Sequence, residues 1–307
     1  MAQKLFKIIL TATVSVILIP GFVCFAQDSS DPAKLPVKFE ELTAPEFIRG
    51  VELSGGICII PMGIMEKHGP HLPLGTDLID VREIVMRAVK KEYGIVFPPY
   101  YFGQIYEAKQ QPGTIAYSPE LVWKILQETC EELARNGLKK IILVNGHGGN
   151  NSFIPYFCQA QLESPKDYVV VFFRPETDPD VARKVRELRK TTTGGHADET
   201  ETSMMMAHRP DLAHTELGKD QSGEDMKRLD HLSYGYTGIW WYAKYPNHYA
   251  GDGSEANPEI GNLVINQAAD QLAELIRILK KDNTAIELQN QFFEQLIDPL
   301  KTRQKIR

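Results

Sequence analysis

The stretch KKIILVNGHGGN, residues 139–150, decides the fold class because it joins a strand signal directly to a glycine-rich turn. Residues 141–144 form an unbroken apolar run, which is typical of a strand buried within a sheet. A strong helix signal precedes it over 118–137, where Ser118 and Pro119 mark a favoured helix start. A helix followed by a buried strand indicates an α/β protein with a parallel sheet.

The same alternation continues on both sides of this stretch. Strands are predicted at 55–63, 95–103 and 168–173, and helices at 78–94, 151–163, 179–190 and 258–281, with a last amphipathic stretch near 284–297. Strands that alternate with helices predict a mostly parallel central sheet with helices on both faces, a three-layer α/β/α fold. Ligands bind such folds beyond the carboxyl ends of the strands.

The first residues have the features of a secretory signal peptide. Lys4 and Lys7 precede an apolar run that ends in small residues at Ala26, before a polar segment. We therefore expect a signal peptide at 1–26, a flexible lead-in at 27–45 and a single domain at 46–307. The mature protein would be periplasmic or secreted, without stable membrane insertion; an uncleaved leader that anchors the chain is the alternative.

Composition narrows the class of partner. The formal net charge is −6 with both signs interspersed, and no basic run suggests nucleic acid as a partner. Without the leader the chain keeps Cys58, Cys130 and Cys158, whose spacing matches no zinc motif. Because Cys58 and Cys158 lie in apolar surroundings, we expect core thiols rather than a disulfide framework.

A second stretch, MEKHGPHLPLGTD at 65–77, holds several metal-binding residue types directly after a predicted strand. Glu66 and His68 are two residues apart, so an extended chain points both to the same side. Asp77 arrives where the next helix begins, and its simpler interpretation is a helix N-cap. The simpler interpretation of His71 is a loop histidine that hydrogen-bonds to backbone. Together, carboxylates and imidazoles would form a mixed oxygen and nitrogen site that suits Zn, Mn or Fe.

Two further segments carry candidate site residues. In NGHGGN the glycines, Gly148 among them, let the backbone approach a ligand closely, and His147 is either a metal ligand or a residue that stabilises a tight turn. In GGHADETETSMMM (194–206), His196 is followed by Asp198, Glu199 and Glu201. This segment is either an acidic turn that caps a helix or a general acid beside a metal site.

An aromatic segment, GYTGIWWYAKYPNHY at 235–249, is the expected wall of a substrate pocket. Trp240 and Trp241 would stack on a flat amide or ring, and His248 would add a polar contact. The alternative is an aromatic oligomer interface.

In this order, PMGIMEKHGPHLPLGTD, NGHGGN and HADETETS resemble the creatininase (creatinine amidohydrolase) family. QPGTIAYSP (111–119) and YAGDGSEANPEIG (249–261) resemble two other recurring segments of that family, so the resemblance covers residues 40 to 280. It implies a two-metal site, in which Glu66 and His147 hold one divalent metal, His68 holds the other and Asp77 bridges them. It also implies a homo-oligomer, with a hexamer as one form.

The chain departs from creatininase proper at the position two residues after the NGH histidine, where Gly149 replaces an acidic ligand. Glu201 is the expected substitute, with Glu199 next, and His196 matches the proton-shuttling histidine of the family. The NGHGGN sequence is closer to branches that include formamide-type deformylases and a peptidase that matures a redox-cofactor precursor. This departure argues against creatinine as the substrate.

The predicted function is that of an exported metal-dependent amidohydrolase. It would hydrolyse a C–N bond other than a peptide bond, in a cyclic or formamide-like amide, with a hydroxide activated by two divalent metals (Zn, Mn or Fe). His196 and Glu201 are the expected catalytic residues, with Glu201 also a metal ligand. The alternatives are a creatininase-like metallopeptidase that acts on a short peptide and a non-catalytic metal or small-molecule binding protein.

Overall fold

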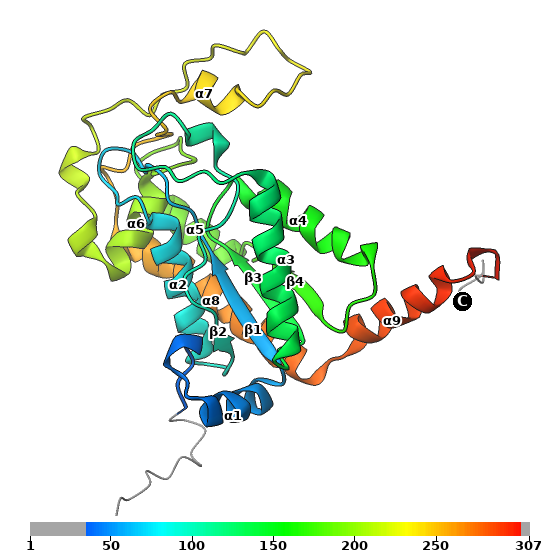
Figure 1. Ribbon diagram of the computed structural model, residues 1–307. Helices are drawn as coiled ribbons and strands as arrows, with labels where there is room; N and C mark the ends of the chain where they lie inside the picture. The colour runs from blue at the N-terminus through cyan, green and yellow to red at the C-terminus, as the bar shows by residue number, and fades with distance from the viewer. Residues whose placement is uncertain (1–34, 302–307) are drawn as a thin grey trace, which may run out of the picture. The chain divides into compact units, whose positions relative to one another are not determined.

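The computed structural model describes residues 35–301, so the signal peptide predicted at 1–26 lies outside the described residues. Its centre is a parallel sheet in the order β2-β1-β3-β4 (Figure 1). The strands are β1 (Ile57–Met62), β2 (Ile95–Val96), β3 (Lys140–Asn145) and β4 (Val169–Phe173). The strand predicted at 95–103 is shorter than expected because Pro98 and Pro99 follow after one further residue, and proline cannot donate to a sheet ladder.

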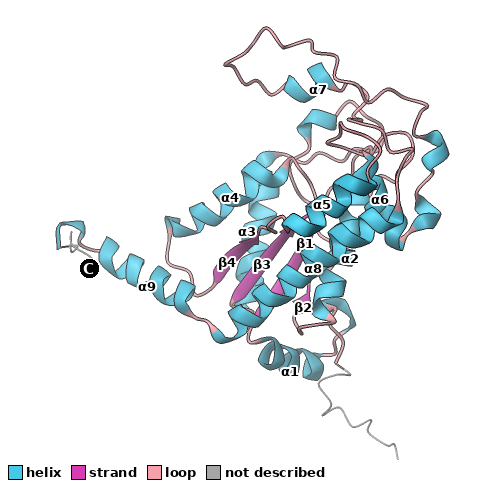
Figure 2. Ribbon diagram, turned by 180° about the vertical axis from the view of Figure 1, so that it is seen from behind, coloured by secondary structure: helices cyan, strands magenta, loops and turns pink. Residues whose placement is uncertain are grey.

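Helices cover both faces of the sheet, which confirms the predicted three-layer architecture (Figures 1 and 2). Ile57 and Ile59 of β1 pack into a cluster with α2 (Thr76–Val89) and α8 (Pro258–Lys281). The alternate residues, Cys58 and Ile60, pack on the other face with α3 (Pro119–Arg135) and α4 (Asn150–Ala160). Burial of each such side chain stabilises the fold by about 1.5–3 kcal/mol, which makes these two layers the main source of stability.

The remaining helices lie around these layers: α1 (Ala44–Ser54), α5 (Pro179–Leu188), α6 (Glu199–His208), α7 (Trp240–Lys244) and α9 (Thr284–Leu296). Short 3-10 turns are present at Phe39–Glu41, Tyr106–Ala108, Gln161–Glu163, Pro210–Leu212, Thr215–Leu217 and Pro299–Lys301. Within residues 35–301, no helix has both the length and the apolar composition that crossing a membrane requires.

Two sequence expectations concern the packing of particular segments. The described part of the predicted lead-in is packed rather than free, because Phe39 and Leu42 contact the cluster beneath α3. Cys58 and Cys130 are buried free thiols, as expected of core residues, and Cys158 is free and half-buried. Burial raises the pKa of the Cys58 thiol far above its ordinary value, so this thiol stays protonated at neutral pH.

The strand order reverses between β1 and β3, and this reversal creates the crevice where α/β sheets bind ligands. The two strands end in register, with Met62 beside Asn145. Gly63 and Gly146 follow them, and both press against the first turn of α2. A Cβ on Gly63 would lie 2.5 Å from the backbone nitrogen of Leu78, and one on Gly146 would lie 2.6 Å from the backbone carbonyl oxygen of Asp77. Only glycine permits this approach.

Candidate active site

The close approach of α2 brings Asp77 to the ends of both strands. Helix α2 begins at Thr76 with Gly75 as its N-cap, so the N-cap interpretation of Asp77 is wrong: the residue lies in the first helical turn. Its carboxylate is buried and points into the crevice instead of back to the helix backbone. The loop after β1 is closed by a hydrogen bond from the Glu66 N–H to the Leu74 carbonyl (3.0 Å), which places Glu66 opposite Asp77.

Hydrogen bonds to backbone carbonyls orient three histidines of the site. The ring Nε2 of His147 donates to the Gln104 carbonyl (2.9 Å), and Nε2 of His196 donates to the Lys67 carbonyl (2.8 Å). The ring Nδ1 of His68 donates to the Glu66 carbonyl (3.2 Å). In each neutral ring the other nitrogen therefore carries a lone pair that faces the crevice, as in histidines that bind metals.

Asp77 lies between two of these histidines. Its Oδ1 is 3.0 Å from His68 Nε2, and its Oδ2 is 3.1 Å from His147 Nδ1. Glu66 Oε1 is 2.7 Å from the same His147 nitrogen. Each oxygen of one carboxylate thus faces a different histidine, which is the arrangement of a carboxylate that bridges two cations.

Buried polar atoms without partners test whether these residues fit a metal. Glu66 Oε1 and Asp77 Oδ2 are buried and accept no hydrogen bond from the described residues. Buried carboxylate oxygens without partners are costly. Either a proton on His147 Nδ1 or a cation between the three atoms would satisfy them, and carboxylate and imidazole donors match Zn, Mn or Fe. The residues therefore fit the first metal.

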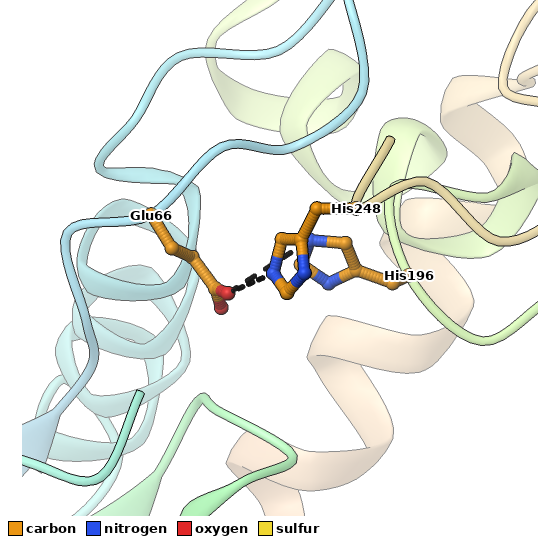
Figure 3. A group of neighbouring side chains, drawn as sticks. All are labelled: Glu66, His196 and His248. Atoms are coloured by element: carbon orange, nitrogen blue, oxygen red, sulfur yellow. Dashed lines mark hydrogen bonds and ion pairs between the residues drawn. The ribbon is translucent and has the colours of Figure 1, made fainter. Parts of the chain in front are cut away.

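Three groups of side chains bring ligand atoms within 4.8 Å of one another: Glu66, Asp77 and His147; His68, His196 and Glu201; and Glu66, His196 and His248. The first two share the crevice through Asp77. The third is not a ligand set, because His248 Nδ1 accepts the indole hydrogen of Trp241 (2.7 Å). Nε2 of a neutral His248 must then carry the hydrogen, which it donates to Glu66 Oε2 (2.5 Å; Figure 3).

The structure separates the two candidates for the missing acidic ligand. Glu199 is fully buried and accepts hydrogen bonds from the Lys190 and Thr191 backbone and from the Thr191 hydroxyl. Glu201 faces the crevice, and its Oε2 is 3.9 Å from His196 Nδ1. Asp198 caps helix α6, so the predicted acidic turn is present beside the site. Glu201 is therefore the carboxylate available to a second metal.

The electrostatics of the crevice favour cations. Burial alone would lower the pKa of His68, but the charge of Asp77 and its hydrogen bond raise that pKa to about 10. Burial, reinforced by the charges of Asp77 and Asp198, raises the pKa of Glu201 to about 8. For His196, burial and the charge of His68 together hold the pKa well below its usual range. The raised pKa of His68 expresses the negative charge of Asp77, whereas burial is the main cause of the raised pKa of Glu201.

For Glu66 the balance of effects is reversed. Burial alone would raise its pKa, but the charges of His147 and His196, the close contact with His147 and a hydrogen bond from His248 hold the pKa well below its usual range. The side chain is therefore a carboxylate despite complete burial. A buried, ionised carboxylate is the form that binds a metal.

A cavity of about 300 Å³ opens onto these residues. All the predicted site residues except His68 line it, together with one that the sequence reasoning missed, Glu107. The lining is Glu66, Asp77, Glu107, His147, Gly148, Gly149, Gly195, His196, Glu201, Trp240, Trp241 and His248. Glu107 stands directly before Ala108, in the segment that precedes QPGT. This proximity to a recurring segment of the family is the sequence signal from which Glu107 could have been predicted. Its carboxylate belongs to no ligand group, and its Oε1 accepts a hydrogen bond from the Gln104 side chain (3.3 Å).

His71 is a loop histidine, as its simpler interpretation predicts, although its ring hydrogen-bonds to a side chain rather than to the backbone. It is buried, and its Nε2 is 2.8 Å from the Thr202 hydroxyl. It belongs to none of the three groups of ligand atoms.

The fold and the site define a parallel α/β/α protein with a buried cluster of carboxylates and imidazoles at the sheet crevice, where the side chains could hold metal ions. The family model of creatininase (creatinine amidohydrolase) matches residues 40–276, and the chain belongs to this family.

Known relatives are hydrolases. The creatinine amidohydrolase of Pseudomonas putida is 27% identical over 191 residues, which span 56% of this chain and 72% of that protein. The 3-dehydro-scyllo-inosose hydrolase of Thermotoga maritima is 25% identical over 246 residues, which span 72% and 76%. A solved creatininase structure superposes on this protein with a TM-score of 0.68 at 22% sequence identity. The match covers 80% of this chain and 99% of the creatininase chain, which shows the shared fold. Creatininase structures include a Zn–Zn form and a Mn form.

Proposed function

We propose that this protein is an exported hydrolase that cleaves a C–N bond in a small cyclic or formamide-like amide with two divalent metals. Family membership and hydrolase relatives support the reaction class. The leader-like sequence at 1–26 supports export.

The observation that carries the proposal is the position of Asp77 between His68 and His147, one carboxylate oxygen toward each. A structural ion pair needs only one of these contacts. Two contacts on opposite oxygens, beside the unpartnered Glu66 Oε1, support a pair of cations that share Asp77.

The two metals would be held by Glu66, Asp77 and His147 and by His68, Asp77 and Glu201. When bound, such metals polarise a carbonyl as Lewis acids and lower the pKa of water. The chain's own residues would do the rest. His196 Nδ1 can accept a proton and deliver it to the leaving nitrogen, because its Nε2–H is held by the Lys67 carbonyl.

The cavity walls would orient the amide. Trp240 offers a flat apolar face, and Gly148 leaves the backbone open, since a Cβ there would meet nothing within 4 Å. Glu107 would accept a hydrogen bond from an N–H group of the substrate. A substrate with a hydrogen-bond donor on the side away from its reacting carbonyl would therefore fit best.

Metal content tests the proposal. Full-length mature protein, His147→Ala and His71→Ala are purified in parallel, and Zn, Mn and Fe per chain are measured by elemental analysis. We expect about two metals in the wild type, a clear loss in His147→Ala and no change in His71→Ala, since both substitutions remove one buried histidine but only His147 lies in a ligand group. A screen of cyclic amides, formamides and short peptides follows on the metal-loaded protein.

Other outcomes identify the alternatives. Less than one metal per chain, unchanged by His147→Ala, would refute the metal site. Bound metal without hydrolysis of any compound in the screen would favour a binding protein, and cleavage of peptides alone would favour the metallopeptidase.

A further inference from the structure

Trp241, His248 and Glu66 form a hydrogen-bonded chain that ends at the candidate metal site. The Trp241 indole N–H donates to His248 Nδ1 (2.7 Å), and His248 Nε2 donates to Glu66 Oε2 (2.5 Å; Figure 3). An indole nitrogen can only donate, so this contact determines which nitrogen of a neutral His248 carries the hydrogen. The chain therefore has one direction, from the indole to the carboxylate.

In this hydrogen-bonded chain, the two carboxylate oxygens of Glu66 have different neighbours. Oε2 is held by His248, and Oε1 is 2.7 Å from His147 Nδ1 and has no hydrogen-bond partner among the described residues. The first contact removes the rotational freedom of the carboxylate and leaves the second oxygen facing the centre. Residues that hydrogen-bond to a ligating carboxylate act in this way in known metal sites.

The backbone of His248 is in a conformation that histidine rarely adopts. Its φ is +52°, in the left-handed region, while the side chain is fully enclosed. Such a residue costs about 1–3 kcal/mol and persists only where the surroundings hold it. Here the neighbouring Ala250 exchanges two backbone hydrogen bonds with His196 (3.2 and 3.0 Å). The strained position thus serves to aim the His248 ring at Glu66.

The hydrogen-bonded chain begins at Trp241, on a segment that is otherwise largely exposed to solvent. Trp241 lies on α7, and the residues before it include Tyr234 and Tyr236, which are solvent-exposed (yellow in Figure 1). Lys67, next to Glu66, ties this segment down through its ammonium group, which donates to the Gln221 side chain and the Asn247 carbonyl. The position of α7 is therefore linked to the position of Glu66.

We propose that Trp241 and His248 are positioning residues that hold Glu66 for the first metal, rather than residues that bind substrate. This inference rests on the proposed metal site. It also revises the expectation that both side chains serve as polar and stacking contacts for the amide. Trp240, one residue away, keeps that role because it lines the cavity and its indole N–H donates no hydrogen bond to the described residues.

Two adjacent tryptophans provide a matched pair of variants. Trp241→Phe keeps an aromatic ring and removes the indole N–H that donates to His248. Trp240→Phe makes the same change at a residue that takes no part in these hydrogen bonds. Metal-stripped mature protein is titrated with Zn²⁺ and with Mn²⁺ against a chromophoric chelator. Loss of such a supporting contact typically weakens metal binding by about 10–100-fold. We expect this loss at one of the two sites in Trp241→Phe and wild-type affinities in Trp240→Phe.

A second pair guards against a variant that does not fold. His248→Gln retains an N–H that can reach Glu66 and should retain most of the metal affinity, whereas His248→Leu should lose it. Circular dichroism of the metal-stripped proteins checks that all variants are folded. Equal affinities in the wild type, Trp241→Phe and His248→Leu would overturn the inference. If the wild type itself binds no metal, the proposed function fails instead.

Discussion

Gly149 and Glu107 share one space in the cavity: a Cβ on Gly149 would lie 2.8 Å from Glu107 Oε1. The same Cβ would lie 2.5 Å from His147 Nε2, the nitrogen that donates to the Gln104 carbonyl. The resemblance to creatininase implies an acidic side chain at the position of Gly149, and here the Glu107 carboxylate lies beside that position.

The first prediction follows from this crowding. Gly149→Ala should displace the His147 ring and reduce the metal content at the site that His147 serves. Gly148→Ala is the matched control, since its Cβ would meet nothing within 4 Å. Metal per chain is measured on both variants after identical purification. Equal metal in both would show that His147 tolerates the contact.

The second prediction concerns Glu107 itself. Glu107→Gln should leave two metals bound, because Glu107 belongs to no ligand group. With an amide that the wild type hydrolyses, we expect kcat/KM to fall by roughly 10-fold or more, the loss of one hydrogen bond to a charged group. Steady-state kinetics and elemental analysis on the same preparations give both values. A loss of metal would instead make Glu107 a ligand.

The third prediction separates two glutamates of the HADETETS segment. Glu201→Gln should lose one metal with little change in stability. Glu199→Gln should keep both metals but unfold more easily, by about 1–3 kcal/mol, because its buried carboxylate accepts several hydrogen bonds from residues 190 and 191. Elemental analysis and urea denaturation distinguish them. The reverse pattern would make Glu199 the ligand.

The fourth prediction is a pH dependence of stability. Burial, with the charge of His68, lowers the pKa of His71 to about 4. Because the folded pKa lies below the unfolded value, the neutral ring stabilises the fold above about pH 6.5, and this stability is lost as the pH falls toward 4.

The effect of His71 should reach about 2 kcal/mol at pH 5 relative to neutral pH. Urea denaturation of metal-stripped wild type and His71→Gln at pH 7 and pH 5 measures it. The wild type should lose more stability than the variant over this interval. A variant that loses as much as the wild type would exclude His71 as the titrating group.

Much of the architecture is predictable because its signals are local. The apolar run at 141–144 and the helix signals around it are properties of neighbouring residues, and they lead directly to the parallel sheet with helices on both faces. The approach of Glu66 to His147 follows from the same reasoning, since both residues come after parallel strands.

The remaining features depend on contacts between distant residues. Asp77 resembles an N-cap in sequence, and only the packing of Gly63 and Gly146 against α2 turns it into the crevice. The aromatic segment around Trp241 predicts a wall on which a substrate stacks. In the structure the Trp241 indole N–H instead donates to His248, which lies in the loop after α7. No pattern of spacing reports such contacts.

The backbone pairing of His196 with Ala250 holds together the two ends of the segment that carries α6 and α7. Lengthening a surface loop is inexpensive, about 0.6 kcal/mol for each doubling of its length. The exposed tip near Tyr234 can therefore be shortened, extended or exchanged without disturbing the anchored base. The length of the segment can thus change at its exposed tip while the hydrogen bonds of His196 and His248 hold its base at the candidate site.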